Sequence, residues 1–133
     1  MRAIKVLIVD DNETFLRAAA LTLNALPGVA LVGAVQSGPE ALPIAIIEQP
    51  DLLLLDVNMP VMDGFRTALR MRAQGVTAKI VFVSLDEAPQ ALAQERDVAY
   101  DGFVAKAHFA GEVQRVIEAL FPSRSAYACG KTL

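Results

Sequence analysis

The sequence predicts an α/β fold, a doubly wound (βα)₅ arrangement around a five-stranded parallel sheet of order 2-1-3-4-5. Short apolar runs rich in leucine and β-branched residues alternate with segments that space their apolar residues as helices do. The apolar runs are continuous and do not alternate with polar residues, which is typical of parallel strands covered by helices on both faces. Right-handed strand–helix–strand connections then favour an open sheet with helices on both sides.

The apolar runs are the expected strands. They cover residues 4–9, 29–35, 52–57, 79–85 and 102–106. The third run, LLLLDV, leads four leucines directly into the carboxylate of Asp56. Burying an ionisable group costs free energy unless it is compensated, so this position asks for a functional explanation.

The first two helices have recognisable starts. One is expected over 12–26, with Asn12 as its N-cap and an end at Pro27-Gly28. The next is expected from about 38 to 48, where Ser37-Gly38-Pro39-Glu40 has the S-x-x-E form of a capping box and Pro43 predicts a distortion. The stripe that faces the core in the first helix is expected to be Phe15, Ala19 and Leu23.

Three further helices complete the alternation. They are expected at 64–73, about 89–96 and 108–120. The first of them begins with Gly64, which we expect where a side chain would obstruct the backbone. The last has helical spacing of its apolar residues Val113, Val116, Ile117 and Leu120.

Length and composition limit the classes of protein to which the chain can belong. The chain has 133 residues, of which 54% are hydrophobic and 20% charged, so we expect one compact domain over 1–121 and a flexible tail or linker stub over 122–133. A net charge of −3 argues against direct nucleic-acid binding by this domain. The single cysteine, the missing signal-peptide core and the lack of a long apolar run favour the cytoplasm and no membrane span.

Polar residues stand at the carboxyl ends of four expected strands. Asp10 and Asp11 follow the first, Asp56 ends the third, Ser84 lies near the end of the fourth, and Lys106 ends the fifth. In a sheet of order 2-1-3-4-5 the first and third strands are neighbours, so the three aspartates should converge. So many carboxylates need a compensating cation, and oxygen ligands alone favour magnesium, Mg²⁺.

These residues resemble the receiver domain of bacterial two-component response regulators, whose fold is flavodoxin-like (CheY-like). The resemblance covers residues 1 to about 121. It is carried by IVDDN, DVNMPVMDG, VFVS with Ser84, and DGFVAK with Lys106, in that order. It implies signal transduction by phosphorelay, in which a phosphoprotein forms an aspartyl phosphate. The chain would then be a phosphoacceptor that assists its own phosphotransfer and dephosphorylation. It would not be an enzyme that acts on a separate substrate.

The resemblance implies a role for each site residue. Asp56 would take the phosphoryl group from a sensor histidine kinase or phosphotransfer protein. Asp11 and Asp56 would bind Mg²⁺ through carboxylates, Asn58 through its backbone carbonyl and Asp10 through water. Lys106 would pair with the phosphate.

The resemblance also implies a switch. Ser84 would donate its hydroxyl to the phosphate and Phe103 would turn inward with it. The face made by helix four, strand five and helix five would change, and a homodimer through that face is possible in the family. An output domain after residue 133 is equally compatible with the sequence.

The chain departs from the family pattern at two positions. Leu85 follows Ser84 where a small residue is usual, so its bulk is expected to restrict access to the site and slow phosphotransfer. Ala107 replaces the proline that commonly follows the lysine, which predicts a trans Lys106–Ala107 peptide. Asn58 and Asp86, at variable flanking positions, are expected to tune the phosphoryl lifetime in a direction that the sequence does not give.

Each of these residues, taken singly, also has an ordinary structural interpretation. Asp11 or Asn12 caps a helix, Asp56 is a loop acceptor, Ser84 and Lys106 are solvated strand ends, and Phe103 is a core aromatic. His108 is expected to have a surface or capping role. The alternative for the whole chain is a receiver-like interaction module that works without phosphorylation, whereas a phosphohydrolase or a dinucleotide-binding protein lacks its required motif.

Overall fold

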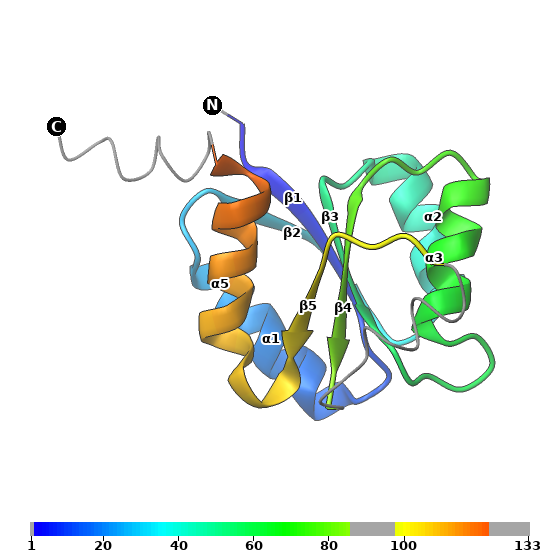
Figure 1. The fold of residues 1–133 in the computed structure, drawn as a ribbon, viewed down its shortest axis with the longest axis horizontal. Helices are drawn as coiled ribbons and strands as arrows, with labels where there is room; N and C mark the ends of the chain where they lie inside the picture. Colours follow the sequence, from blue (N-terminus) through cyan, green and yellow to red (C-terminus); the bar gives the residue numbers. More distant parts are fainter. Residues whose placement is uncertain (1, 86–97, 123–133) are drawn as a thin grey trace, which may run out of the picture.

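A single parallel sheet of five strands, in the order β2-β1-β3-β4-β5, forms the centre of the molecule (Figure 1). The structure, a computed structural model, describes residues 2–85 and 98–122. The predicted fold class and strand order are therefore confirmed, and the last three strands each end one residue earlier than expected. The strands are β1 Ile4–Val9, β2 Val29–Val35, β3 Leu52–Asp56, β4 Lys79–Ser84 and β5 Gly102–Ala105.

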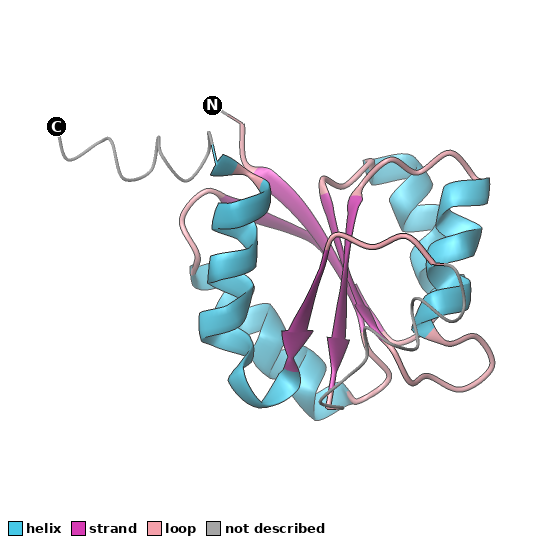
Figure 2. Cartoon of the chain, in the orientation of Figure 1, coloured by secondary structure: helices cyan, strands magenta, loops and turns pink. Residues whose placement is uncertain are grey.

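Helices cover both faces of the sheet (Figure 2). Helices α1 and α5 pack on one face and α2 and α3 on the other, as the two separate hydrophobic clusters show. The helix expected at 89–96 lies outside the described residues. The described helices are α1 Glu13–Ala25, α2 Gly38–Glu48, α3 Gly64–Ala73, the short 3₁₀ helix η1 Lys106–His108, and α5 Phe109–Leu120.

The central position of β3 explains why it consists almost entirely of leucine. All of its leucines are fully buried, since β3 lies between β1 and β4 with helices above and below. Side chains alternate along a strand, so Leu53 and Leu55 pack under α2 and α3 while Leu52 and Leu54 pack under α1 and α5. A central parallel strand thus needs an apolar residue at every position.

Helix α1 begins as predicted and packs the predicted stripe against the sheet. The Asn12 side chain accepts a hydrogen bond from the Phe15 amide at 2.9 Å, which is the N-cap expected. The buried residues are Leu16, Ala19 and Leu23, whereas Phe15 is only half-buried. Phe15 nevertheless packs against the same hydrophobic cluster as Ala19 and Leu23, so the predicted stripe is confirmed, with Phe15 at its partly exposed edge and Leu16 added to it.

Helix α2 also begins at the predicted residue. The Ser37 hydroxyl accepts a hydrogen bond from the Glu40 amide at 3.3 Å and donates one to the Glu40 carboxylate at 2.8 Å. The helix runs from Gly38 to Glu48 without a break at Pro43. It ends with Gln49 in the left-handed conformation, at φ 50°.

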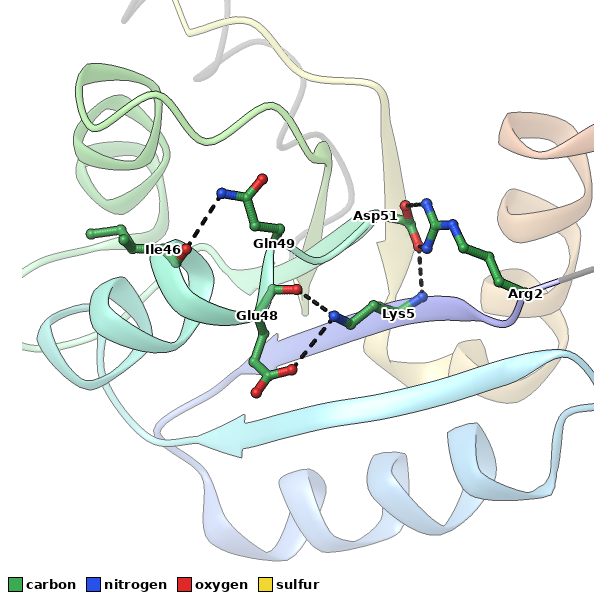
Figure 3. Close-up of polar contacts among 6 residues, drawn as sticks. All are labelled: Arg2, Lys5, Ile46, Glu48, Gln49 and Asp51. Atoms are coloured by element: carbon green, nitrogen blue, oxygen red, sulfur yellow. Dashed lines mark hydrogen bonds and ion pairs between the residues drawn. The ribbon is translucent and has the colours of Figure 1, made fainter.

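A polar cluster joins strands and helix at the edge of the sheet where β1 and β3 begin (Figure 3). Asp51 accepts hydrogen bonds from the Arg2 guanidinium at 2.7 and 3.0 Å and from the Lys5 amide at 2.8 Å. The Lys5 ammonium reaches the end of α2, where it donates to the Glu48 carbonyl and pairs with the Glu48 carboxylate at 3.5 Å. This cluster ties the start of β1 to the segment before β3.

The connection from β5 to α5 carries the predicted trans geometry. No described peptide bond is cis, so the trans Lys106–Ala107 peptide is confirmed. The Ala105 amide donates a hydrogen bond of 2.9 Å to the Glu112 carboxylate on α5. His108 is exposed and its side chain makes no capping hydrogen bond, which agrees with the surface role expected for it. Within the described residues, no helix is long and apolar enough to cross a membrane.

Candidate functional site

The carboxyl ends of the strands meet at one edge of the sheet, the lower edge in Figure 1. Val9 of β1 is paired with Leu55 of β3. The next residue of each segment, Asp10 and Asp56, therefore lies at the same end of the two adjacent strands. Both carboxyl residues are buried, with 1% and 4% of their surface exposed. Asp10 is held by its amide, which donates to the Val35 carbonyl at 3.0 Å, and by its Oδ1, which accepts from the Asn12 amide at 2.8 Å.

Three carboxylates gather at this edge, as the sequence predicts. Asp10, Asp11 and Asp56 each offer an oxygen within 4.8 Å of the others. Asp11 is exposed while its two companions are buried, so the cluster opens to solvent on the Asp11 side. The alternative interpretation of Asp56, as no more than a loop hydrogen-bond acceptor, is not tested by its burial.

Lys106 extends into the carboxylate cluster. Its Nζ lies 2.8 Å from Asp10 Oδ2 and 3.3 Å from Asp56 Oδ1, and only 10% of its side chain is exposed. The interpretation of Lys106 as a solvated strand end is therefore wrong. On another side, its ammonium lies 4.9 Å from the centre of the Phe15 ring.

The electrostatics of the cluster favour a proton on Asp56. Burial raises the pKa of Asp56 to about 7, the Asp10 carboxylate adds to the rise, and Lys106 opposes it. Burial disfavours the Lys106 ammonium, but the neighbouring Asp10 and Asp56 carboxylates outweigh burial and raise the pKa of Lys106. The lysine therefore stays charged, and Asp56 takes up a proton near neutral pH.

The donor set fits a hard divalent cation. Three carboxylates face one ammonium, which leaves a surplus of negative charge if all are ionised. Asp10 Oδ2 is buried and lies 2.8 Å from the Lys106 ammonium, so that one lysine is shared between Asp10 and Asp56. A site that offers only oxygen ligands and more carboxylates than ammonium groups matches the preferences of Mg²⁺.

The other predicted site residues lie around this cluster. Ser84 is the last residue of β4, is 2% exposed, and lies beside Ala105, the residue before Lys106. Asn58 is exposed in the loop after β3. Phe103 is half-buried and packs against the hydrophobic cluster under α2 and α3. Its ring lies edge-on to that of Tyr100, with the ring centres 4.6 Å apart. Asp86 lies outside the described residues.

Leu85 points to solvent. Its side chain is 78% exposed, so its bulk does not fill the space between the buried strand ends. The expectation that Leu85 restricts access therefore concerns only an approaching partner at the rim of the site.

Gly64 is required by the site itself. A Cβ on Gly64 would lie 2.1 Å from the Asp56 carbonyl oxygen and 2.9 Å from its carbonyl carbon. The Gly64 amide donates to the Val57 carbonyl at 2.9 Å, which brings the start of α3 against the end of β3. The sequence prediction of an obstructing side chain at this position is confirmed.

Two residues near Lys106 escaped sequence reasoning. Phe15 was assigned to the core by its helical spacing, and Glu112 carried no prediction. Neither belongs to a strand end, so no local pattern points to them; only the packing of α1 and α5 across the same face brings them to the β5 end.

Comparisons with known proteins were consistent with this geometry. A family model described as the response regulator receiver domain matches residues 6–118. The chain is 30% identical over 103 residues to a nitrate/nitrite response regulator protein homolog from Haemophilus influenzae, covering 77% of this chain and 50% of the relative. It is 40% identical over 81 residues to a protein-glutamate methylesterase/protein-glutamine glutaminase from Syntrophus aciditrophicus, covering 61% of this chain and 23% of the relative.

Solved structures give the same result. The signal receiver domain of the putative response regulator NarL from Mycobacterium tuberculosis superposes with a TM-score of 0.78 at 25% identity, covering 94% of this chain and 98% of that one. A LuxR-family two-component response regulator from Aurantimonas sp. SI85-9A1 reaches a TM-score of 0.81 at 20% identity, over 92% of this chain and 87% of that one, and supports the fold alone. The chain spans half the length of the first curated relative and less than a quarter of the second.

Proposed function

This chain belongs to the response regulator receiver domain family, and we propose that its Asp56 accepts a phosphoryl group from a phosphohistidine of a sensor histidine kinase or phosphotransfer protein. An Asp56 carboxylate oxygen forms a bond to phosphorus while the phosphorus–nitrogen bond of the donor breaks. The released imidazole takes up a proton from water. The product is an acyl phosphate on a buried strand end.

The observation that supports this proposal most is the position of Asp56 between a buried ammonium and two further carboxylates. Lys106 lies 3.3 Å from Asp56 Oδ1 and supplies positive charge where the phosphoryl oxygens would come to lie. Asp10 and Asp11 supply further oxygens for a cation beside Asp56. A buried carboxylate flanked in this way is suited to attack a highly charged phosphorus centre and not to make a structural hydrogen bond.

We further propose that Mg²⁺ is bound by the Asp11 and Asp56 carboxylates, by the backbone carbonyl of Asn58 and, through water, by Asp10. Such a cation neutralises charge on the transferring phosphoryl oxygens. Lys106 stays with the phosphate after transfer and Ser84 donates its hydroxyl to it. Ser84 ends β4 and Lys106 directly follows β5, so the phosphate would connect the ends of these neighbouring strands.

The proposed output is a change of the surface that follows these strands. Phe103 turns inward when Ser84 moves, and the face of β5 and α5, with the segment before β5, changes its shape. This face is the proposed contact for a homodimer or an output partner. Because the curated relatives are longer than this chain, we propose that the domain controls a separate activity in the cytoplasm and has no turnover of its own.

The test is phosphorylation with a small donor. Purified protein treated with acetyl phosphate and Mg²⁺ should gain one phosphate by intact mass, and the Asp56→Asn variant should gain none. A Glu118→Gln variant, changed at an exposed position of α5, should behave as wild type. Absence of an adduct with acetyl phosphate and with phosphorylated histidine donors would favour the phosphorylation-independent interaction module instead.

A further inference from the structure

Lys106 is held from a side that its carboxylate partners do not explain. Its Nζ lies 4.9 Å from the centre of the Phe15 ring, inside the roughly 6 Å range of a cation–π contact. The ring is itself fixed, because Phe15 packs edge-on against Phe109 with centroids 5.3 Å apart and planes at 85°. Phe109 is buried at the start of α5, just after the lysine loop.

The packing shows that Phe15 is more than a core residue of α1. The buried stripe of that helix consists of Leu16, Ala19 and Leu23, and Phe15 is half-buried beside it. Its ring packs edge-on against Phe109 and also faces the Lys106 ammonium. The face of an aromatic ring adds an attraction for a cation that leucine cannot supply.

Lys106 needs such a support. Its long stem has about 2 kcal/mol of rotamer entropy to lose, and it follows a β5 end with no proline after it. The carboxylates of Asp10 and Asp56 attract it, but Asp56 is the group that changes when a phosphoryl group arrives. Phe15 keeps its contact independently of that change, because α1 and α5 belong to one hydrophobic cluster.

We propose that Phe15 is a positioning residue that holds the Lys106 ammonium over the reacting carboxylate by a cation–π contact. This inference rests on the proposed function, because Lys106 acts on the phosphoryl group of Asp56. Phe15 touches neither the reacting oxygens nor phosphorus. It acts through the lysine, and its removal should slow transfer without abolishing it.

The variants separate the ring face from the ring volume. Phe15→Leu keeps an apolar side chain but removes the aromatic ring face. Phe15→Tyr keeps an aromatic ring of nearly the same volume and its face. Pentafluorophenylalanine at position 15 keeps the shape of the ring but reverses the sign of its face potential. Phe121→Leu is the matched control, since Phe121 packs at the edge of the same cluster from the end of α5.

The first measurement is the rate of phosphorylation by acetyl phosphate at saturating Mg²⁺. Phe15→Leu and the pentafluoro variant should be about two- to fivefold slower, as expected for loss of one cation–π contact. Phe15→Tyr and Phe121→Leu should match wild type. Equal rates in all variants that fold would overturn the inference, and the pentafluoro variant covers the case in which Phe15→Leu does not fold.

The second measurement does not depend on phosphotransfer. The Lys106 ε-methylene NMR signals, assigned by their loss in Lys106→Met, should carry an upfield ring-current shift. Phe15→Leu should remove that shift, and Phe15→Tyr and Phe121→Leu should retain it. If wild type forms no adduct with any donor, the proposed function fails; if an adduct forms but neither rate nor shift depends on the ring, only the role of Phe15 fails.

Discussion

At the scale of single residues, Asp56 combines two properties that oppose each other. It must be ionised to attack phosphorus or bind a cation, yet burial and Asp10 raise its pKa to about 7. Lys106 offsets part of this effect without removing it. A proton and the proposed divalent cation would therefore compete for the same carboxylate near neutral pH.

Mg²⁺ affinity should consequently depend on pH. Below about pH 7 the proton on Asp56 must leave before the cation binds, so the affinity should fall by up to about tenfold per pH unit. Above pH 7 the affinity should level off. Titration of the protein with Mg²⁺ by calorimetry between pH 5.5 and pH 8.5 measures this slope, on the order of one proton released per ion.

The Asp56→Asn variant provides the control for that titration. It has no ionisable group at this position, so its weaker binding should lose most of the slope around pH 7. An affinity of the wild type that stays constant from pH 6 to pH 8 would show that Asp56 is not the group in competition.

Gly64 shows how one missing side chain makes room for the site. Gly64→Ala should destabilise the fold by about 1–3 kcal/mol, because its Cβ would lie 2.1 Å from the backbone oxygen of Asp56 and neither backbone can yield cheaply. Urea unfolding measures the difference. Mg²⁺ binding should weaken as well, since the strand end that carries Asp56 must move.

Gly111 is the matched control for that substitution. A Cβ there meets no atom within 4 Å, and the residue is exposed in α5. Gly111→Ala should therefore stabilise the protein by about 0.5–1 kcal/mol, the usual gain of alanine over glycine inside a helix. Two alanines with changes of the same sign would contradict the packing described at Gly64.

At the scale of elements, the junction of β5 and α5 positions the lysine. Ala107 follows Lys106 in a trans peptide, and η1 leads directly into α5. The Glu112 carboxylate accepts a hydrogen bond of 2.9 Å from the Ala105 amide. This bond connects the last residue of β5 to the first turn of α5. The strand end is fixed by a side chain from the helix that follows it.

Removal of this connection should affect stability and phosphorylation together. Glu112→Ala leaves the half-buried Ala105 amide without its acceptor and should cost about 1–2 kcal/mol of unfolding free energy. Acetyl phosphate should also phosphorylate the variant more slowly, because the backbone next to Lys106 is released. Glu118→Ala, at an exposed site of the same helix, should change neither urea unfolding nor the rate.

At the scale of the whole molecule, the two edges of the sheet have different roles. The carboxyl edge gathers carboxylates that repel one another, whereas the opposite edge holds Asp51 between Arg2 and the Lys5 amide (Figure 3). Burial would raise the pKa of Asp51, but its hydrogen bonds with Arg2 and Lys5 outweigh burial and lower it.

The Asp51 cluster should give a pH-dependent contribution to stability. Because the folded pKa is lowered, the contribution is present above the ordinary carboxyl value of about 4 and is lost as the pH falls through the folded value. Asp51→Ala should lose about 1 kcal/mol of unfolding free energy at pH 7 and less at pH 3. Asp51→Asn, which keeps an acceptor for the Lys5 amide, should lose less at pH 7.

Much of the fold follows from local patterns in this chain. Continuous apolar runs set the strands to within one residue, and Asn12, Ser37 and Gly64 mark the helix starts. The order of the strands was expected because five-stranded doubly wound sheets commonly take it, and this order brings Asp10 and Asp56 together. Asp10, Asp11, Asp56 and Lys106 were therefore predictable as one cluster.

The sequence by itself determined the described strands and helices and the polar residues at the strand ends, because these depend on hydrophobic periodicity and capping, which act within one segment, while the strand order was expected from the order common to doubly wound sheets. Only the tertiary structure decided that Lys106 is buried, that the pKa of Asp56 is raised to about 7, that Phe15 contacts the lysine, and that Glu112 binds the amide of the residue before it. Burial and the rotation of a helix about its axis result from packing among all elements. No local pattern contains that information.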